Sequence, residues 1–186
     1  AQTGNALERY LFDHVDLPRQ INYMATTCIL QNIDASDKNH YLYRDTEGTG
    51  EWTMLPWDLD LTLGPNALHT DTIVASHAFA SHPYTGARPY TLSSGKYNHF
   101  LEVIVAHPGT RAMLNRRIRS LVDDYLANGY FEARMDELLT LIGPDVLLDK
   151  AAWGGSAHFG GTDFTLETAT DRIKNEHLVP RVPYLT

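Results

Sequence analysis

The segment that decides the fold of this chain is residues 32–64, which read NIDASDKNHYLYRDTEGTGEWTMLPWDLDLTLG. Two runs rich in aromatic residues, His40–Tyr43 and Trp52–Trp57, flank a polar turn that contains two glycines. This pattern predicts a β-hairpin with a long loop. Acids and an amide stand before the first predicted strand and after the second. No other part of the chain concentrates chemistry in this way.

The rest of the chain is predicted to be mainly helical. Asp16 before Leu17-Pro18 is a plausible N-cap for a helix that runs to about Gln31 and carries a largely apolar face. Gly143-Pro144 is expected to end a helix. The other predicted helices cover residues 6–14, 97–107, 111–127, 131–142, 145–153 and about 165–178. The expected fold class is α+β, mainly α, with residues 1–186 forming a single domain and a β-hairpin inserted at about residues 40–57.

Composition narrows the classes of partner. Hydrophobic residues make up 43% of the chain and charged residues 20%, which is typical of a globular domain. The net charge of −8 argues against nucleic acid or an anionic membrane as the main partner, because phosphate groups require a basic surface. The single cysteine, Cys28, stands in an apolar run and is expected to be a buried thiol.

The acids and the amide around the hairpin suggest phosphoryl transfer. Asp34 precedes Asn39 by five positions, and Asp58 and Asp60 follow the second predicted strand. An aspartate can orient an attacking hydroxyl or accept its proton, and the amide and a further acid can hold a metal on nucleotide phosphates. A capped helix end followed by a turn explains the same spacing equally well.

A calcium-binding loop beginning at Asp34 is a weaker alternative. Its fifth position would be Lys38, a cation where an oxygen ligand is needed, and its sixth would be Asn39 in place of the glycine that makes the sharp turn. The closing glutamate would fall at Asp45, beyond a predicted strand. We therefore discard the calcium-binding interpretation.

The order of motifs in this segment resembles the CotH kinase family, atypical protein kinases first known from bacterial spore coats. That family has an acid, then an asparagine that enters a strand, then a short hairpin and the pattern Trp-x-x-x-Pro-Trp-Asp-x-Asp-x-x-x-Gly. This chain has Asp34, Asn39, the run Trp52–Asp60 and Gly64 in the same order. Its end, RVPYL from Arg181 to Leu185, also resembles the closing stretch of the family.

The resemblance assigns a role to each site residue. It implies that Asp34 is the catalytic aspartate and that Asn39 and Asp58 bind metal. Asp60 is implied as a further metal contact, and Lys38 as part of the nucleotide site with Asn39 and Asp58. The implied cofactors are ATP and Mg²⁺ or Mn²⁺. The chain departs from a conventional kinase because Asn32-Ile33 replaces His-Arg before the aspartate, and because the glycine comes six residues after Asp58.

The resemblance also implies an activity, partners and a location. The first hypothesis is an enzyme that transfers the γ-phosphoryl group of ATP to a hydroxyl of a protein substrate. The second is a non-catalytic interaction module of a coat or surface. The chain resembles a C-terminal lobe, so an N-terminal lobe of the same protein is an expected partner and this chain alone is expected to be inactive. The family suggests a bacterial coat, surface or secreted context.

Two further expectations concern residues around this segment. Trp52, Trp57 and Tyr41 are expected to form the core of the hairpin, with Trp57 fixing the loop beside Asp58 by its burial. Residues 65–96 lack any helical or strand periodicity and contain several histidines, whose spacing fits no compact zinc motif. His69, Lys96 and Tyr97 are candidates for contact with substrate.

Overall fold

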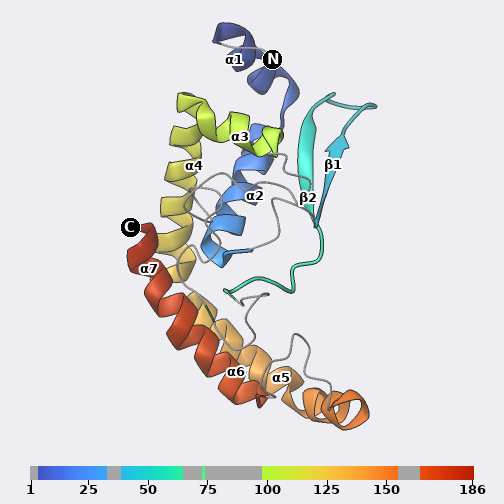
Figure 1. Cartoon of the computed structure of the whole chain (residues 1–186), viewed down its shortest axis with the longest axis vertical. Helices are drawn as coiled ribbons and strands as arrows, with labels where there is room; N and C mark the ends of the chain where they lie inside the picture. Colours follow the sequence, from blue (N-terminus) through green and yellow to red (C-terminus); the bar gives the residue numbers. More distant parts are fainter. Residues whose placement is uncertain (1–3, 33–38, 65–72, 74–97, 155–163) are drawn as a thin grey trace.

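The computed structural model describes residues 4–32, 39–64, 73, 98–154 and 164–186, in which a helical body carries one β-hairpin on its side (Figure 1). The expected α+β, mainly α class is confirmed. Within the described ranges, no helix combines the length and the apolar character needed to cross a bilayer. The elements are α1 (Asn5–His14), α2 (Leu17–Leu30), β1 (His40–Arg44), β2 (Trp52–Pro56), α3 (His99–Ala106), α4 (Pro108–Leu121), η1 (Val122–Leu126), α5 (Tyr130–Trp153), α6 (Leu166–Arg172), η3 (Ile173–Leu178) and α7 (Val179–Leu185).

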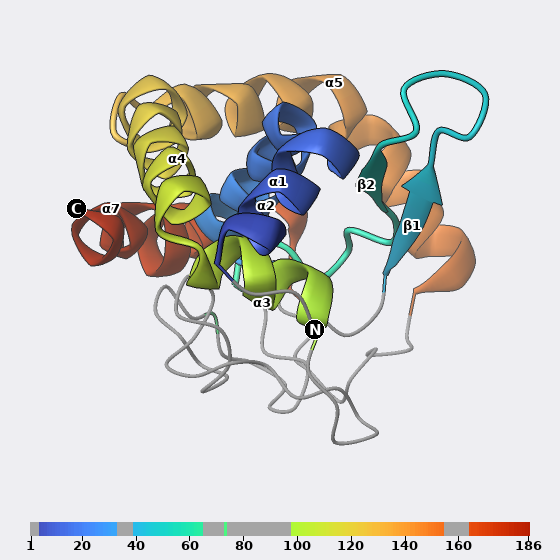
Figure 2. The ribbon, with the colours of Figure 1, turned by 90° about the horizontal axis from the view of Figure 1, so that it is seen from above.

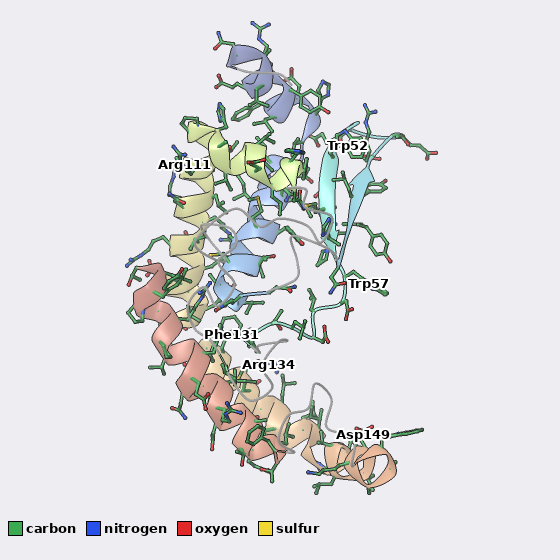
Figure 3. All side chains as sticks on the ribbon, viewed as in Figure 1. Trp52, Trp57, Arg111, Phe131, Arg134 and Asp149 are labelled. Carbon is green, nitrogen blue, oxygen red and sulfur yellow. The ribbon has the colours of Figure 1, made fainter. Side chains whose placement is uncertain are left out.

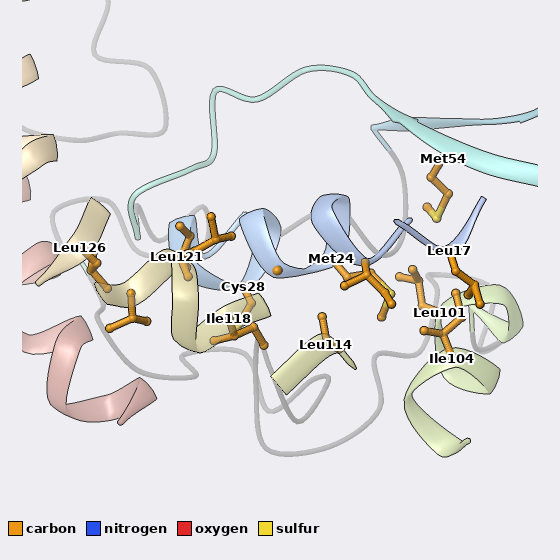
Figure 4. Packing of buried hydrophobic residues seen from close by; sticks show 14 of the residues in the cluster. Leu17, Met24, Cys28, Met54, Leu101, Ile104, Leu114, Ile118, Leu121 and Leu126 are labelled. Atoms are coloured by element: carbon orange, nitrogen blue, oxygen red, sulfur yellow. The ribbon is translucent and has the colours of Figure 1, made fainter. Parts of the chain in front are cut away.

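Helix α2 is the centre of the packing. It begins where the sequence predicts, because the Asp16 carboxylate accepts a hydrogen bond of 3.1 Å from the Arg19 backbone N–H and Pro18 occupies the first turn. Its apolar face packs along α4, and α3 and Met54 of β2 close the core around it (Figure 4). Cys28 is fully buried there, as expected. The other buried α2 residues are Leu17, Gln20, Ile21, Met24, Ala25 and Ile29.

The hairpin lies against the side of α2 that α4 leaves open (Figures 1 and 2). Strands β1 and β2 pair antiparallel, with His40 opposite Pro56 and Arg44 opposite Trp52. Their turn is closed by Asp45, whose carboxylate accepts a hydrogen bond of 2.9 Å from the Thr49 N–H. The turn lies at the end of the hairpin that faces α1, so the opposite end, the foot, lies nearer the C-terminal end of α2 (Figure 1).

Two predicted helix ends are wrong. Residues 131–142 and 145–153 belong to one helix, α5, which continues through Gly143 and Pro144. A proline removes one backbone hydrogen bond and bends a helix without always ending it, and α5 changes direction along its length (Figures 1 and 2). The last predicted helix does not stop at Leu178, because η3 leads directly into α7.

Candidate functional site

The foot of the hairpin brings Asn39 and Asp58 together. Strand β1 begins immediately after Asn39, and Asp58 is the second residue after β2. The Trp57 N–H donates a hydrogen bond of 3.0 Å to the Asn39 carbonyl oxygen, which extends the strand pairing by one step. Asn39 therefore lies opposite Trp57, and Asp58 is the next residue along the chain.

Both residues have left-handed backbone conformations. The φ angle is +60° at Asn39 and +52° at Asp58. Asn and Asp adopt this region more readily than other residues with a side chain. Gly64, which closes the motif recognised in the sequence, has a φ angle of +81°, a conformation that favours glycine. The residue types of the motif thus match the backbone that the foot of the hairpin requires.

The last turn of α2 holds the segments on either side of the site. The Asn32 N–H donates to the Thr27 carbonyl oxygen at 3.1 Å, and the Leu63 N–H donates to the Leu30 carbonyl oxygen at 2.7 Å. Leu63 ends the loop that carries Asp58 and Asp60, and Asn32 lies two residues before Asp34. This turn is therefore the point at which Asn32 and the loop after β2 meet (Figure 1).

Gln20 joins the middle of α2 to β2. Its side-chain oxygen accepts a hydrogen bond of 3.0 Å from the Met54 N–H, and its side-chain nitrogen lies 3.5 Å from the Met54 sulfur. At the start of the helix, the Asp16 N–H donates to the Trp52 carbonyl oxygen at 3.0 Å. These contacts and the Leu30–Leu63 bond hold the hairpin and the loop after it at three positions along α2. They set the position of Asp58 relative to the end of α2.

Two aromatic residues near the site are not core residues, contrary to the expectation. Trp57 is 60% exposed and Tyr41 is 57% exposed. Their rings meet edge to face, with centroids 5.8 Å apart, and Trp57 lies at the foot of the hairpin (Figure 3). Strand residues alternate between two faces, and β1 buries neither face, so aromatic content alone misplaced these rings. Trp52 is half-buried, and the Arg44 guanidinium lies 5.6 Å from its ring centroid.

Asp34, Lys38, His69, Lys96 and Tyr97 lie outside the described residues. Asp58 and Asp60 are both exposed. Within the described ranges, no group of three or more His, Cys, Asp or Glu side chains is placed to hold a metal ion. The donors at the foot of the hairpin are nonetheless amide and carboxylate oxygens, the type that hard divalent cations prefer. Asn39, Asp58 and Asp60 therefore fit a divalent cation by donor chemistry.

A mainly apolar cavity of about 280 Å³ lies beside the site, between α2 and β2. Leu59 and Thr62 of the loop after β2 form part of its wall, and Asn32 forms another part. The Thr62 hydroxyl donates to the Leu59 carbonyl oxygen at 2.9 Å, which closes a turn within this loop. The loop that carries Asp58 and Asp60 thus has apolar support on its inner side.

Sequence reasoning missed two polar residues that support the site, Gln20 and Arg181. Each is completely buried. Gln20 is spaced one and four residues from Ile21 and Met24 on the apolar face of α2, and a polar residue at such a position signals a buried hydrogen bond. In the sequence, Arg181 stands out only as part of the family resemblance at the C-terminus. Its contact partner, 153 residues earlier in the chain, has no local sequence signal.

Two comparisons with known proteins bear on this chain. The family model described as CotH kinase protein matches residues 1–178 of the 186 residues. No curated protein matches the chain.

Proposed function

The chain belongs to the CotH kinase family, and from this premise we propose that it is the part of a protein kinase that transfers the γ-phosphoryl group of ATP to a hydroxyl of a protein substrate. The family supports a kinase-like protein in general terms. The observation that carries the proposal is the meeting of Asn39 and Asp58 at the foot of the hairpin, next to the turn of α2 that leads to Asp34.

In this proposal each site residue has a distinct role. Asp34 orients the acceptor hydroxyl and takes its proton. Asn39 and Asp58 hold Mg²⁺ or Mn²⁺, Asp60 contributes a further oxygen, and Lys38 contacts the nucleotide phosphates. A bound divalent cation would supply positive charge against the phosphate oxygens of ATP.

In this proposal, the described fold contributes to phosphoryl transfer by holding the site residues in position. Phosphoryl transfer depends mainly on holding the reacting groups in position and on offsetting charge, because the protein performs little covalent chemistry. Three hydrogen bonds, from the start, the middle and the end of α2 to the hairpin and the loop after it, keep the loop that carries Asp58 at a fixed position along α2. The left-handed turns at Asn39 and Asp58 direct the chain away from the strand pairing at the place where ligands are needed.

A metal-dependent phosphate-transfer assay tests this function. It uses this chain together with any further sequence that its gene encodes, radiolabelled ATP, Mg²⁺ or Mn²⁺, and a general protein acceptor. Wild-type protein is expected to label itself or the acceptor, and Asp34→Ala and Asp58→Ala are each expected to reduce labelling at least a hundredfold. Glu47→Ala is the matched control, since Glu47 is an exposed carboxylate in the turn at the far end of the same hairpin. Equal labelling by all four proteins, or none by wild type, favours the non-catalytic interaction module.

A further inference from the structure

Arg181 is the largest of the completely buried side chains in the described part of the chain. A guanidinium group keeps its charge in proteins, so its burial is unfavourable unless hydrogen bonds and favourable electrostatics offset the loss of water. Burial does lower the pKa of Arg181 from its ordinary value. A charged group in such a place needs a structural reason.

The contacts of Arg181 point to the end of α2. Its Nη2 donates a hydrogen bond to the carbonyl oxygen of Cys28, in the last turn of that helix. The C-terminal end of a helix carries partial negative charge, so a cation there is favoured. The ring of Tyr184, one turn later on α7, lies 4.9 Å from the guanidinium carbon and covers the charge. Helix α7 thus brings a cation to the carbonyl groups at the C-terminal end of α2, where the Cys28 oxygen also accepts a hydrogen bond of 3.3 Å from the Gln31 N–H.

This same turn of α2 is the junction beside the site. Thr27 and Leu30 accept hydrogen bonds from Asn32 and Leu63, and Cys28 accepts one from Arg181. Three carbonyl groups within four residues are therefore each held by a different segment of the chain. Asp34 follows Asn32 after one residue. Whatever fixes this turn also fixes Asn32 and Leu63, which are bonded to it.

We propose that Arg181 is a positioning residue for phosphoryl transfer, which holds the last turn of α2 and thereby Asn32, two residues before Asp34, and Leu63, at the end of the loop that carries Asp58. The expected effect of Arg181 on catalysis rests on the proposed function. Its effect on the last turn of α2 rests on geometry alone. The family match ends at residue 178, three residues before Arg181, so the match itself does not assign this role.

Hydrogen exchange measured by mass spectrometry tests the structural part. The variants are Arg181→Met, which removes the charge and the donors, and Arg181→Lys, which keeps the charge with a single nitrogen. Arg117→Met is the matched control, because the Arg117 Nε also reaches across to α2, donating to the Asn22 side chain at 2.6 Å, but far from the last turn. All proteins are compared at a temperature where circular dichroism shows them folded.

Arg181→Met is expected to speed exchange at least tenfold in the peptides that span residues 26–32 and 59–64, which contain the amides bonded to this turn, with Arg181→Lys intermediate and Arg117→Met like wild type. Exchange in α4 and in the hairpin turn is expected to stay unchanged. Unchanged exchange at residues 26–32 and 59–64 overturns the proposal. Equal acceleration along the whole chain also overturns it, because that result describes a residue that only stabilises the fold. If Arg181→Met does not fold, the comparison is made with Arg181→Lys.

The phosphate-transfer assay tests the catalytic part. Arg181→Met is expected to lower kcat at least tenfold and to change the KM for ATP less than threefold, with partial recovery in Arg181→Lys. A kcat equal to that of wild type overturns the catalytic role. If the wild-type protein transfers no phosphate, the proposed function fails, and the exchange measurement still decides whether Arg181 holds the last turn of α2.

Discussion

Asn39 and Asp58 have a left-handed backbone, and the proposed function requires an oxygen ligand from each of them as well. The backbone requirement acts on stability, whereas the ligand requirement acts on function, so substitutions can separate them. Glycine satisfies the first and lacks the second, and alanine satisfies neither.

At Asn39 this separation gives a direct prediction. Asn39→Ala is expected to lower the free energy of unfolding by about 1 kcal/mol because an alanine at a φ angle of +60° is strained. Asn39→Gly is expected to be within about 0.5 kcal/mol of wild type. Both variants are expected to lose metal-dependent phosphate transfer. Urea denaturation measures the first effect, and equal stability of the two variants would show that the backbone does not select the residue.

Cys28 makes the stability of the protein depend on alkaline pH. Burial raises the pKa of its thiol from 9.0 to about 11, although the nearby Arg181 works in the opposite direction. The unfolded thiol loses its proton near pH 9 and the folded one near pH 11, so the folded state holds the proton more tightly between these values. The stability contributed by this group is present below pH 9 and is lost as the pH rises toward 11. The total change is roughly 2 to 3 kcal/mol.

The measurement compares wild type with Cys28→Ala by urea denaturation at several pH values from 8 to 10.5. Other groups that titrate in this range affect both proteins alike, so the difference between them isolates the thiol. The stability advantage of wild type over the variant is expected to shrink as the pH rises. A difference that stays constant over this range would contradict a raised pKa.

At the scale of the secondary-structure elements, the position of the site depends on the contact between α2 and β2. Gln20 alone supplies a side-chain acceptor to the Met54 N–H, in a buried position. Gln20→Leu is expected to lower the free energy of unfolding by about 1 to 3 kcal/mol, because it leaves that N–H buried without a partner. Gln20→Glu keeps an acceptor and is expected to fall between wild type and Gln20→Leu. Denaturation curves check the order, and a leucine variant as stable as wild type would show that the bond is dispensable.

A helix or strand could be predicted well where the residues that determine it lie within a few positions of each other in the sequence. The start of α2 and the two strands are predicted correctly because a cap, a proline, and aromatic-rich runs on either side of a polar turn act within a few residues. Helix α5 was split in the prediction because a Gly-Pro pair usually ends a helix, whereas here the helix bends and continues. Whether a helix ends or continues at a Gly-Pro pair depends on tertiary packing, which involves residues far apart in the sequence.

The same distinction applies to the site. Asn39, Asp58 and Gly64 could be picked out in the sequence because they belong to a motif of particular residue types at fixed spacing, and the hairpin does bring Asn39 and Asp58 together. The exposure of Trp57 could not be found, since it depends on what covers the outer face of β1. Gln20 and Arg181 act through partners 34 and 153 residues away, and such pairs become visible only when the chain is folded.

For the molecule as a whole, charge and exposure together predict weak binding of nucleotide by these 186 residues alone. The net charge of −8 repels the phosphates of ATP. Asp58 and Asp60 are exposed, so their attraction for a cation is weakened by water and salt. Isothermal titration of ATP with Mg²⁺ into the chain is therefore expected to show no binding tighter than about 10 μM at physiological salt. Asp58→Ala is the control for heat that does not come from the site. A sub-micromolar affinity that disappears in this variant would mean that the chain encloses the nucleotide by itself, and the two-lobed arrangement implied by the family would then be unnecessary for binding.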